Sequence, residues 1–365
     1  MKSVSIIDAR IHTTLGNLND TWRRINSNQT GIRYHQKKSL PNNMPLGVIE
    51  DLEGELGSNF RYRQLVDLLF DETVILPDGT SVIMSTTKGA VDELVNSPDL
   101  DSLKGQPWNL VNYINKKLGL KSPPYTISAA CASGSMSIIS AVMRILSGIE
   151  KFVLVIGIDL LSLFVTAGFN SLKAITQDTC RPFDLNRDGL VLGEGIGYIL
   201  LADNYEAKKL NLPAIAEVTG WGAACDATHI TAPSRTADGL IDSIKQATNN
   251  LKNKVGGINA HGTGTPYNDA MEIYAFNNLW KPPPAFHSVK GAIGHCLGAA
   301  GIIEVALAIK SLHQGKLPPT VGLQNPEKNA FESVVYDKAI DLSFSSILKC
   351  NSGFGGINVA LLIEV

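Results

Sequence analysis

The sequence lacks paired cysteines and long uncharged apolar runs. Its five cysteines are an odd number, are widely scattered and form no CxxC pair, which argues against a disulfide framework and a zinc site. The most apolar stretch, residues 152–167, contains Asp159 and is shorter than the ~20 residues that a membrane-spanning helix needs. The apolar run near the N-terminus is broken by Asp8, so it lacks the core of a signal peptide. We therefore expect a cytoplasmic protein with free thiols, no metal site and no membrane partner.

The composition gives no bias towards one class of macromolecular partner. The 365 residues carry a formal net charge of -2, and 44% of them are hydrophobic. This balance is typical of a globular protein with a large core and gives no reason to expect nucleic acid as a partner. The length alone is compatible with roughly two domains of ~150 residues.

Short apolar runs alternate with helical patterns from about residue 120 onward, which is typical of an α/β protein with a mainly parallel sheet. The predicted strands are residues 1–14, 125–129, 151–156, 194–201, 214–220, 257–260 and 358–365. The predicted helices are residues 61–70, 133–146, 239–251 and 298–312.

One arrangement occurs twice in a loose form. A strand, a turn of small residues and an apolar helix surround Cys131, and the same succession surrounds His295. We interpret this as two similar halves packed as one compact unit. The predicted halves are residues 1–204, with Cys131, and residues 205–365, with His261 and His295.

Cys131 lies between a predicted strand and a predicted helix in TISAACASGSMSIISAVMRI. Unpaired N–H groups and the positive end of the helix dipole at such a junction lower a thiol pKa and favour the thiolate. The small neighbouring residues allow a substrate carbonyl to approach. A lone cysteine in an apolar context is more often a packing residue, so a nucleophilic role for Cys131 requires partner residues.

Two histidines in glycine-rich loops supply these partners. His261 is in NAHGTGTPYND and His295 is in SVKGAIGHCLGAAG. Thr263 and Thr265 offer hydroxyls for a polar, chain-like ligand, and Asp269 is a candidate carboxylate behind the first histidine. A single loop histidine is as often structural as catalytic, but two near a candidate nucleophile favour chemistry.

Charged and glycine-rich segments surround these histidines. Lys290 precedes His295 by five residues and Glu304 follows it by nine, so they can pair and fix its tautomer; a capped or solvated helix residue is an equally good interpretation of Glu304. The KCNSGFGGINV segment, with Phe354, could bind an oxyanion through backbone N–H groups or could be only a turn. The glycines at residues 193–197 lack GxGxxG spacing, and no GxxxxGK[ST] motif occurs, which argues against nucleotide binding.

Taken together and in order, these segments resemble the Cys-His-His β-ketoacyl-[acyl-carrier-protein] synthases of the thiolase superfamily, the KAS I/II-like type. The resemblance runs nearly end to end and rests on AACASGS, RPFDLNRDGLVLGEG, AHGTGTPYND and KGAIGHCLGAAG. It implies a thiolase-like layered αβαβα fold built from two pseudo-symmetric halves.

The resemblance also implies roles for individual residues. Cys131 matches the acyl-accepting nucleophile, and His261 and His295 match the pair that serves decarboxylation. The other matches are Lys290 and Glu304 as supporting charges, the N–H groups of Cys131 and Phe354 as oxyanion hole, Thr263 and Thr265 at the phosphopantetheine arm, and Phe169 in the acyl pocket.

The implied reaction is an acyl transfer followed by a decarboxylative Claisen condensation. An acyl group passes from an acyl carrier protein to Cys131, and malonyl carrier then loses CO2 to give an enolate that attacks the acyl-cysteine. The substrates stay on the phosphopantetheine of the carrier, and no other cofactor or metal is implied. The implied partners are the acyl carrier protein and a second subunit, either identical or of the chain-length-factor type.

The chain departs from the family in two places. Ser352 stands where the Asn-Ser-Phe-Gly-Phe-Gly-Gly run of the family has its first phenylalanine, in a loop that gates acyl entry. The chain also looks shorter than typical members, with an atypical stretch at residues 34–80. The implied pathways are fatty acid, polyketide and aryl polyene synthesis, and a reduced cover over the pocket would suit a special acyl chain, such as a polyene, better than a general fatty acid synthase.

Two other functions remain open. A thiolase would need a second cysteine in a C-terminal Cys-x-Gly turn, and Cys350 lies close to that place but is followed by Asn-Ser. A chain-length-factor-like subunit would shape the pocket of a partner, although such subunits usually lack the nucleophile. For carrier docking, Arg61 and Arg63 in RYRQLVD are candidate contacts, and an ordinary solvated helix face is an equally good interpretation.

Overall fold

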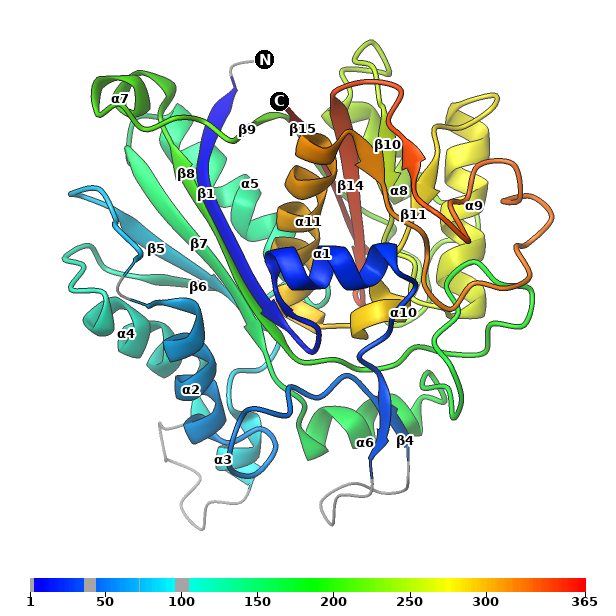
Figure 1. Cartoon of the computed structure of the whole chain (residues 1–365), viewed down its shortest axis with the longest axis horizontal. Coiled ribbons are helices and arrows are strands. Elements are labelled where there is room, and N and C mark those ends of the chain that lie inside the picture. The colour runs from blue at the N-terminus through cyan, green and yellow to red at the C-terminus, as the bar shows by residue number, and fades with distance from the viewer. Residues whose placement is uncertain (1–2, 36–43, 72, 96–104) are drawn as a thin grey trace.

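The computed structural model describes residues 3–35, 44–71, 73–95 and 105–365. Within these residues, strands from both ends of the sequence join into one continuous sheet of eleven strands (Figure 1). Residues 36–43 and 72, which belong to the atypical stretch noted above, lie outside the described residues.

The first half of the chain forms one side of this sheet, in the order β6–β5–β7–β8–β1. β5 pairs in parallel with both β6 and β7, whereas β8 pairs antiparallel with β7 and β1. The strands are β1 (Val4–Thr13), β5 (Ser81–Ser85), β6 (Tyr125–Ile127), β7 (Phe152–Asp159) and β8 (Gly195–Ala202).

The second half repeats this order and these directions as β11–β10–β14–β15–β9. β10 is parallel to β11 and β14, whereas β15 is antiparallel to β14 and β9. The strands are β9 (Ala216–Cys225), β10 (Gly257–Asn259), β11 (Phe286–His287), β14 (Ser346–Gly353) and β15 (Ile357–Glu364). Antiparallel pairing of β1 with β9 joins the two halves. The strand order therefore repeats, while the division between residues 204 and 205 stays a prediction.

The prediction of a mainly parallel sheet is wrong. Each half has two parallel pairs at its outer edge and two antiparallel pairs towards the centre. Alternating strands and helices suggested crossovers throughout, but only a three-residue turn links β14 to β15. So short a connection can join only antiparallel neighbours, because a parallel crossover needs a dozen residues or more.

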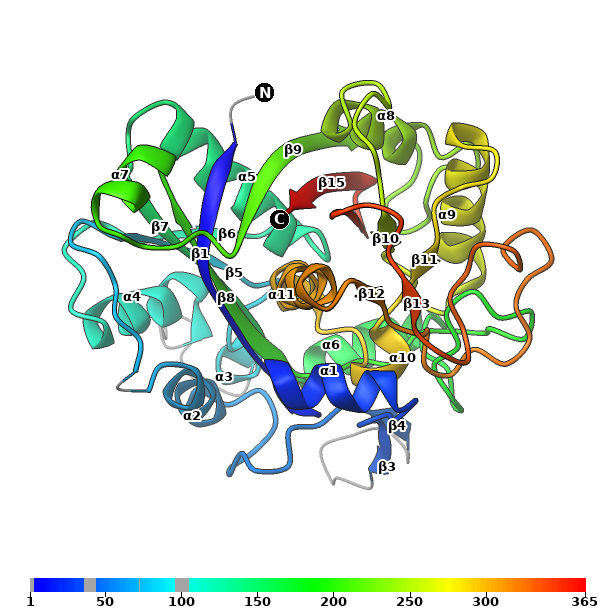
Figure 2. The same ribbon diagram turned by 45° about the horizontal axis from the view of Figure 1, so that its top comes forward.

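Helices complete a five-layer arrangement (Figures 1 and 2). α5 (Ser133–Leu146) and α11 (Ala300–Gln314) lie between the two halves of the sheet. α2 (Asn59–Leu69) and α4 (Pro107–Lys117) cover the outer face of the first half, and α8 (Asp238–Ala247) and α9 (Pro266–Leu279) that of the second. α11 is buried almost all round, as its apolar sequence requires.

The predicted repeat around Cys131 and His295 corresponds to equivalent places in the two halves. Cys131 follows β6 and precedes α5, and His295 follows β11 and precedes α11. The two helices approach closely at Gly134 and Gly301, since a Cβ on Gly301 would lie 2.6 Å from the backbone N of Ser135. This close approach brings the N-terminal ends of both helices, and the residues before them, to one place.

The remaining elements are short or peripheral. They are β2 (Gly16–Asn17), α1 (Leu18–Asn26), β3 (Arg33–His35), β4 (Met44–Leu46), α3 (Val91–Val95), α6 (Leu163–Ser171), α7 (Asn204–Lys209), α10 (Lys290–Ile293), the 3-10 helix η2 (Leu297–Ala299), β12 (Lys316–Leu317) and β13 (Ile340–Asp341). In the part of the chain that the structure covers, no helix is long and apolar enough to cross a lipid bilayer.

Candidate active site

Cys131 lies at the N-terminal end of α5, in the wall of a cavity of about 330 Å³. Only 7% of the residue is exposed, and burial raises the pKa of its thiol to about 12, an effect that Lys290 only partly opposes. The expected lowering of the thiol pKa is therefore wrong, because the cost of burying a thiolate outweighs the nearby positive charge. In this geometry the side chain is a neutral thiol at neutral pH.

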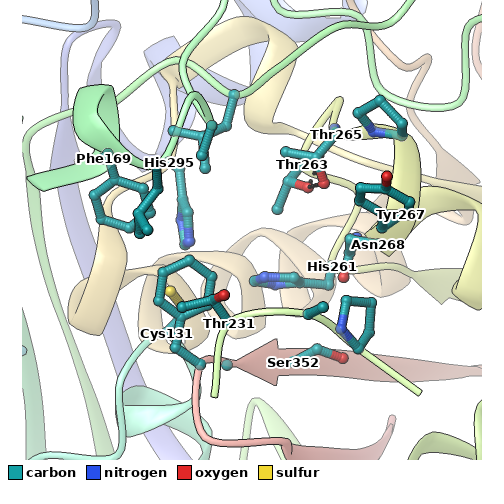
Figure 3. Close-up of a pocket in the computed structure, with 18 of the residues that line it drawn as sticks. Cys131, Phe169, Thr231, His261, Thr263, Thr265, Tyr267, Asn268, His295 and Ser352 are labelled. Carbon is teal, nitrogen blue, oxygen red and sulfur yellow. Dashed lines mark hydrogen bonds between the residues drawn. The ribbon is translucent and has the colours of Figure 1, made fainter. Parts of the chain in front are cut away.

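His295 faces the same cavity from the loop that precedes η2 (Figure 3). Its Nδ1 accepts a hydrogen bond from the N–H of Leu297 at 3.3 Å. An accepting Nδ1 assigns the proton of the neutral ring to Nε2, and Nε2 has no hydrogen-bond partner among the described residues. His295 therefore has a free N–H donor at Nε2.

His261 follows β10 and has the same tautomer for a similar reason. Its Nδ1 lies 3.4 Å from Nζ of Lys290 and 3.3 Å from Nδ2 of Asn351, both of which are donors. Nδ1 must therefore accept, and the proton lies on Nε2. The rings of His261 and His295 are 5.2 Å apart between centroids and nearly perpendicular. Figure 3 shows both rings and the Cys131 thiol facing one space.

Both imidazoles are neutral. Burial lowers the pKa of His295 to about 3, and Lys290 acts in the same direction. Burial and Lys290 also hold the pKa of His261 well below its usual value. The site thus combines one neutral thiol and two neutral N–H donors, a set suited to stabilising a developing oxyanion without protonating a carbanion.

Lys290 and Glu304, both predicted from the sequence, form a buried ion pair beneath the histidines, with 2.5 Å between Nζ and Oε1. A second lysine, Lys349, was not predicted from the sequence; its Nζ lies 2.8 Å from Oε2 of the same carboxylate. Burial would raise the pKa of Glu304, but the two lysines outweigh it and lower this pKa to about 2. The sequence does contain a signal for this role: Lys349 interrupts the apolar run of the penultimate strand, where a charged side chain needs a buried partner.

The first turns of α9 hold the His261 loop. Glu272 accepts hydrogen bonds from the N–H groups of His261 and Gly262, both at 2.7 Å. Asp269 accepts from the N–H groups of Thr263 and Gly264 at 3.0 and 3.1 Å. Burial and the nearby Asp269 raise the pKa of Glu272 to about 7. Two buried carboxylates therefore fix the backbone that presents His261.

The predicted substrate-binding residues line the same cavity as Cys131. The hydroxyls of Thr263 and Thr265 are 2.9 Å apart, on the side of the cavity away from the thiol (Figure 3). The ring of Phe169 on α6 stacks on that of Phe354, with centroids 5.4 Å apart. These two rings also line a second, mostly apolar hollow of about 680 Å³.

The predicted oxyanion donors lie side by side. A Cβ on Gly353 would be 3.2 Å from the backbone N of Cys131, so the turn carrying Phe354 lies against that amide. Neither the N–H of Cys131 nor that of Phe354 donates to a backbone acceptor among the residues that the structure covers. N–H groups in this place next to the thiol fit the hydrogen-bond donors that an oxyanion needs.

Residues 66–207 match "Beta-ketoacyl synthase, N-terminal domain", and residues 215–324 match "Beta-ketoacyl synthase, C-terminal domain". Together these matches cover more than half of the chain. The chain belongs to the β-ketoacyl synthase family.

Two curated relatives illustrate the similarity. The 3-oxoacyl-[acyl-carrier-protein] synthase 2 of Vibrio cholerae is 34% identical over 277 residues, which cover 71% of this chain and 67% of the relative. A mitochondrial 3-oxoacyl-[acyl-carrier-protein] synthase of Arabidopsis thaliana is 34% identical over 287 residues, which cover 70% of this chain and 60% of the relative. Several of the curated relatives are thus matched over less than two thirds of their own length.

Solved structures agree along the whole chain. The ishigamide ketosynthase/chain length factor superposes with a TM-score of 0.85 at 25% identity, covering 100% of this chain and 99% of the other. The ketosynthase ApeO in complex with its chain length factor ApeC, from Xenorhabdus doucetiae, gives a TM-score of 0.81 at 24% identity, covering 100% and 98%. These matches confirm the predicted thiolase-like fold of layered α/β structure.

The gate region departs from the family's sequence pattern in this β-ketoacyl synthase. Ser352 lines the cavity, and its hydroxyl donates to Oδ1 of Asn358 at 2.7 Å. Asn358 in turn donates to Asp226 at 3.0 Å. A small polar side chain therefore stands where the resemblance led us to expect phenylalanine, and these hydrogen bonds join it to two other residues that line the cavity.

The prediction that Arg61 contacts an acyl carrier is wrong. Arg61 is 1% exposed, forms a 2.7 Å ion pair with Glu194 and donates to backbone carbonyls, including that of Ile49. A buried cation that is paired with a carboxylate inside the fold cannot present its charge to a partner. Arg63 is exposed, with its guanidinium over the ring of Tyr113, and its docking role stays a prediction.

Cys350, which raised the thiolase alternative, lies away from the site. It is fully buried in the hydrophobic cluster under α8 and α9 and does not line the cavity that holds Cys131. Burial raises its pKa, so it stays a neutral thiol in an apolar environment. This position gives no support to a second catalytic cysteine.

Proposed function

We propose that the chain catalyses decarboxylative Claisen condensation between an acyl group held on Cys131 and malonyl-acyl carrier protein, giving β-ketoacyl-acyl carrier protein. One observation carries this proposal above the others. Two neutral imidazoles carry their protons on Nε2 and line the same cavity as the Cys131 thiol. Such donors stabilise an enolate oxygen without supplying a proton to its carbon.

The first half-reaction is a thioester exchange. The sulfur of Cys131 attacks the carbonyl of an acyl carrier thioester, and the tetrahedral oxyanion accepts hydrogen bonds from the N–H groups of Cys131 and Phe354. The C–S bond to the carrier then breaks. The proton of the Cys131 thiol is transferred to the sulfur of the carrier, which leaves as a neutral thiol.

The second half-reaction forms the carbon–carbon bond. Malonyl carrier loses CO2, and the electron pair of the broken C–C bond becomes an enolate whose oxygen accepts hydrogen bonds from His261 and His295. The enolate carbon attacks the acyl carbon on Cys131, and the C–S bond of the acyl-cysteine breaks. The released Cys131 thiolate takes a proton from water, which restores the resting enzyme.

The other predicted residues position the substrates in this proposal. Thr263 and Thr265 hold the phosphopantetheine arm, while Lys290 and Glu304 support the histidines. The acyl chain passes the Phe169–Phe354 pair into the apolar hollow that these rings border. The reaction uses carrier-bound substrates alone, and we propose no further cofactor and no metal.

We further propose that the chain works in the cytoplasm with an acyl carrier protein, as a homodimer or with a chain-length-factor-type subunit. The support comes from proteins similar in fold, one described as a ketosynthase in complex with its chain length factor. The chain elongated belongs to fatty acid, polyketide or aryl polyene synthesis, and the small Ser352 at the gate favours an extended acyl group.

Intact mass spectrometry after mixing with acyl carrier tests the nucleophile. We expect an acyl adduct on the wild-type chain, no adduct on Cys131→Ala, and an undiminished adduct on Cys225→Ala, because Cys225 is an exposed thiol at another place. The experiment is repeated with a candidate partner subunit. No adduct on Cys131 under either condition rejects the synthase proposal and favours a chain-length-factor-like role.

Release of CO2 from malonyl carrier tests the histidines separately. His261→Ala and His295→Ala should each reduce decarboxylation by roughly 100-fold or more, the cost of removing one oxyanion donor. Both variants should keep acylation of Cys131 closer to wild type. Equal loss of both half-reactions would contradict the assigned division of labour.

A further inference from the structure

The buried Lys349 has no role in the functions assigned above. It lies on β14 and is fully buried. Its Nζ donates to the carbonyls of Asn259 and Ala260, both at 3.2 Å, and to that of Cys350 at 2.5 Å. A buried lysine needs such partners, because removing an ammonium group from water is costly.

Lys349 shares one carboxylate with Lys290. Each oxygen of Glu304 has its own lysine, Oε1 with Lys290 at 2.5 Å and Oε2 with Lys349 at 2.8 Å. One lysine would be enough to neutralise the carboxylate. Burial lowers the pKa of Lys349 and Glu304 opposes this effect, and a protonated Lys349 gives the cluster one excess positive charge. That charge lies in the interior, directly behind the histidines.

Two routes connect Lys349 to His261. The carbonyls that it binds belong to Asn259 and Ala260, the two residues immediately before His261. Oε2 of Glu304 also accepts from Nδ2 of Asn351 at 3.1 Å, and that same amide contacts Nδ1 of His261. Lys349 therefore contacts the backbone that carries His261. It also contacts the Glu304 carboxylate, which holds the Asn351 amide that binds the His261 ring.

We propose that Lys349 is a positioning residue of the active site: it holds Glu304 and the backbone before His261 in place and adds a positive charge behind the two histidines. The assignment of a catalytic purpose to this effect rests on the proposed condensation. The electrostatic effect itself does not depend on that reaction.

The direction of the effect follows from the charges around the rings. Lys290 on α10 and Lys349 on β14 lower the pKa of both histidines, and Glu304 on α11 raises that of His295. Glu272 on α9 binds the backbone of His261. Other titratable groups near these residues include Cys131, Asp159, His287, Cys296 and Cys350. Burial is the largest cause of the low histidine pKa values, and Lys349 lowers both further. Removing its charge must therefore raise both.

The test compares Lys349→Met, which removes the charge, with Lys349→Arg, which keeps it. The surface variant Lys252→Met is the matched control. Histidine ring carbons are labelled with ¹³C, and His261 and His295 are assigned from single His→Gln variants and titrated by NMR without substrate. Lys349→Gln, which keeps a hydrogen-bond donor but no charge, is a second variant in case Lys349→Met does not fold.

We expect the uncharged variants to raise the pKa of both histidines by roughly one unit, since a nearby like charge shifts a pKa by that order. Decarboxylation should fall at least tenfold because Glu304 and the backbone before His261 lose their anchor, while Cys131 acylation changes less than threefold. Lys349→Arg should return the titrations towards wild type. Unchanged histidine titrations in the uncharged variants overturn the proposal.

Failure of the proposed function gives a different result. If the wild-type chain neither forms an acyl-cysteine nor decarboxylates malonyl carrier, while the histidine pKa values still rise without Lys349, the condensation is wrong and the electrostatic role stands. If decarboxylation falls only in step with thermal stability and the titrations do not move, Lys349 is a structural residue alone.

Discussion

At the scale of single residues, the site keeps its reactive groups uncharged. Burial raises the pKa of the Cys131 thiol and lowers those of both histidines. The cysteine is thus not a free thiolate in this geometry, and in the proposed reaction its reactivity would depend on the bound thioester and the N–H groups beside it. The charged side chains of the site are Lys290, Glu304 and Lys349, which form ion pairs behind the histidines.

His287 lies near Lys349 and Glu304 and is a buried polar side chain whose contribution to stability can be tested. It is 1% exposed, and neither ring nitrogen has a hydrogen-bond partner among the described residues. We expect His287→Leu to raise the free energy of unfolding by about 1–3 kcal/mol at pH 7.5, because an unsatisfied buried polar group is removed. Chemical denaturation measures this difference.

The same variant has a predicted pH dependence. Burial lowers the pKa of His287 to about 3 from 6.5, so the unfolded chain binds a proton below pH 6.5 and the folded chain does not. The wild type therefore loses stability as pH falls below 6.5, and His287→Leu does not lose this contribution. The advantage of the variant should grow by roughly 1.4 kcal/mol at pH 5.5. An advantage that is equal at both pH values contradicts the assigned burial of a neutral imidazole.

At the scale of elements, the contact between α5 and α11 brings the two halves of the site together. A Cβ on Gly301 would lie 2.6 Å from the backbone N of Ser135, whereas a Cβ on Gly168 in α6 would meet nothing within 4 Å. We expect Gly301→Ala to lower the free energy of unfolding by about 1–3 kcal/mol through overpacking. Gly168→Ala should raise it by about 0.5 kcal/mol through reduced chain entropy.

The Gly301 variant also has a functional consequence. Forcing α5 and α11 apart moves Cys131 relative to His295. At a temperature where the variant remains folded, the rates of acylation and condensation should therefore be lower than those of the wild type. Circular dichroism and the acylation assay, run on the same samples, separate the two effects. Similar behaviour of Gly301→Ala and Gly168→Ala would show that the helix contact does not set the site geometry.

Residues of the β14–β15 hairpin form one border of the cavity. Ser352 on β14 lines it, and a phenylalanine there would fill space that is now open. We expect Ser352→Phe to reduce acylation of Cys131 by a long acyl carrier at least about tenfold relative to acetyl carrier. Ser352→Ala removes the hydrogen bond to Asn358 but keeps the space, so it should leave the chain-length ratio nearly unchanged.

At the scale of the whole molecule, a buried ion pair ties the outer layer to the central sheet. Arg61 on α2 pairs with Glu194, which immediately precedes β8, and Glu194 also accepts from the N–H of Ile49 at 2.9 Å. We expect Arg61→Met to lower the free energy of unfolding by about 3–5 kcal/mol, because Glu194 is left buried without its counter-ion.

Arg63 provides the matched control for this prediction. Its side chain is exposed, so Arg63→Met should cost less than about 1 kcal/mol, the scale of an exposed cation–π contact. Urea denaturation of both variants measures the difference. An equally small cost for both variants would show that the Arg61 pair contributes little to the stability of the fold.

The sequence determined the parts of this protein that depend on local chemistry. The apolar pattern at residues 133–146 matches α5 to the residue, and the histidine and cysteine motifs lie where the sequence placed them, at the ends of strands and the starts of helices. The order of the motifs predicted the family, because each motif needs its own small residues and loop geometry.

Only the tertiary structure decided what depends on distant residues. The direction of the central strands, the burial of Arg61 and the second lysine on Glu304 all arise from contacts between segments far apart in the chain. The pKa of Cys131 is the clearest case. The local pattern of a helix N-terminus predicted a lowered value, but the surrounding layers remove the thiol from water, and desolvation outweighs the nearby positive charge.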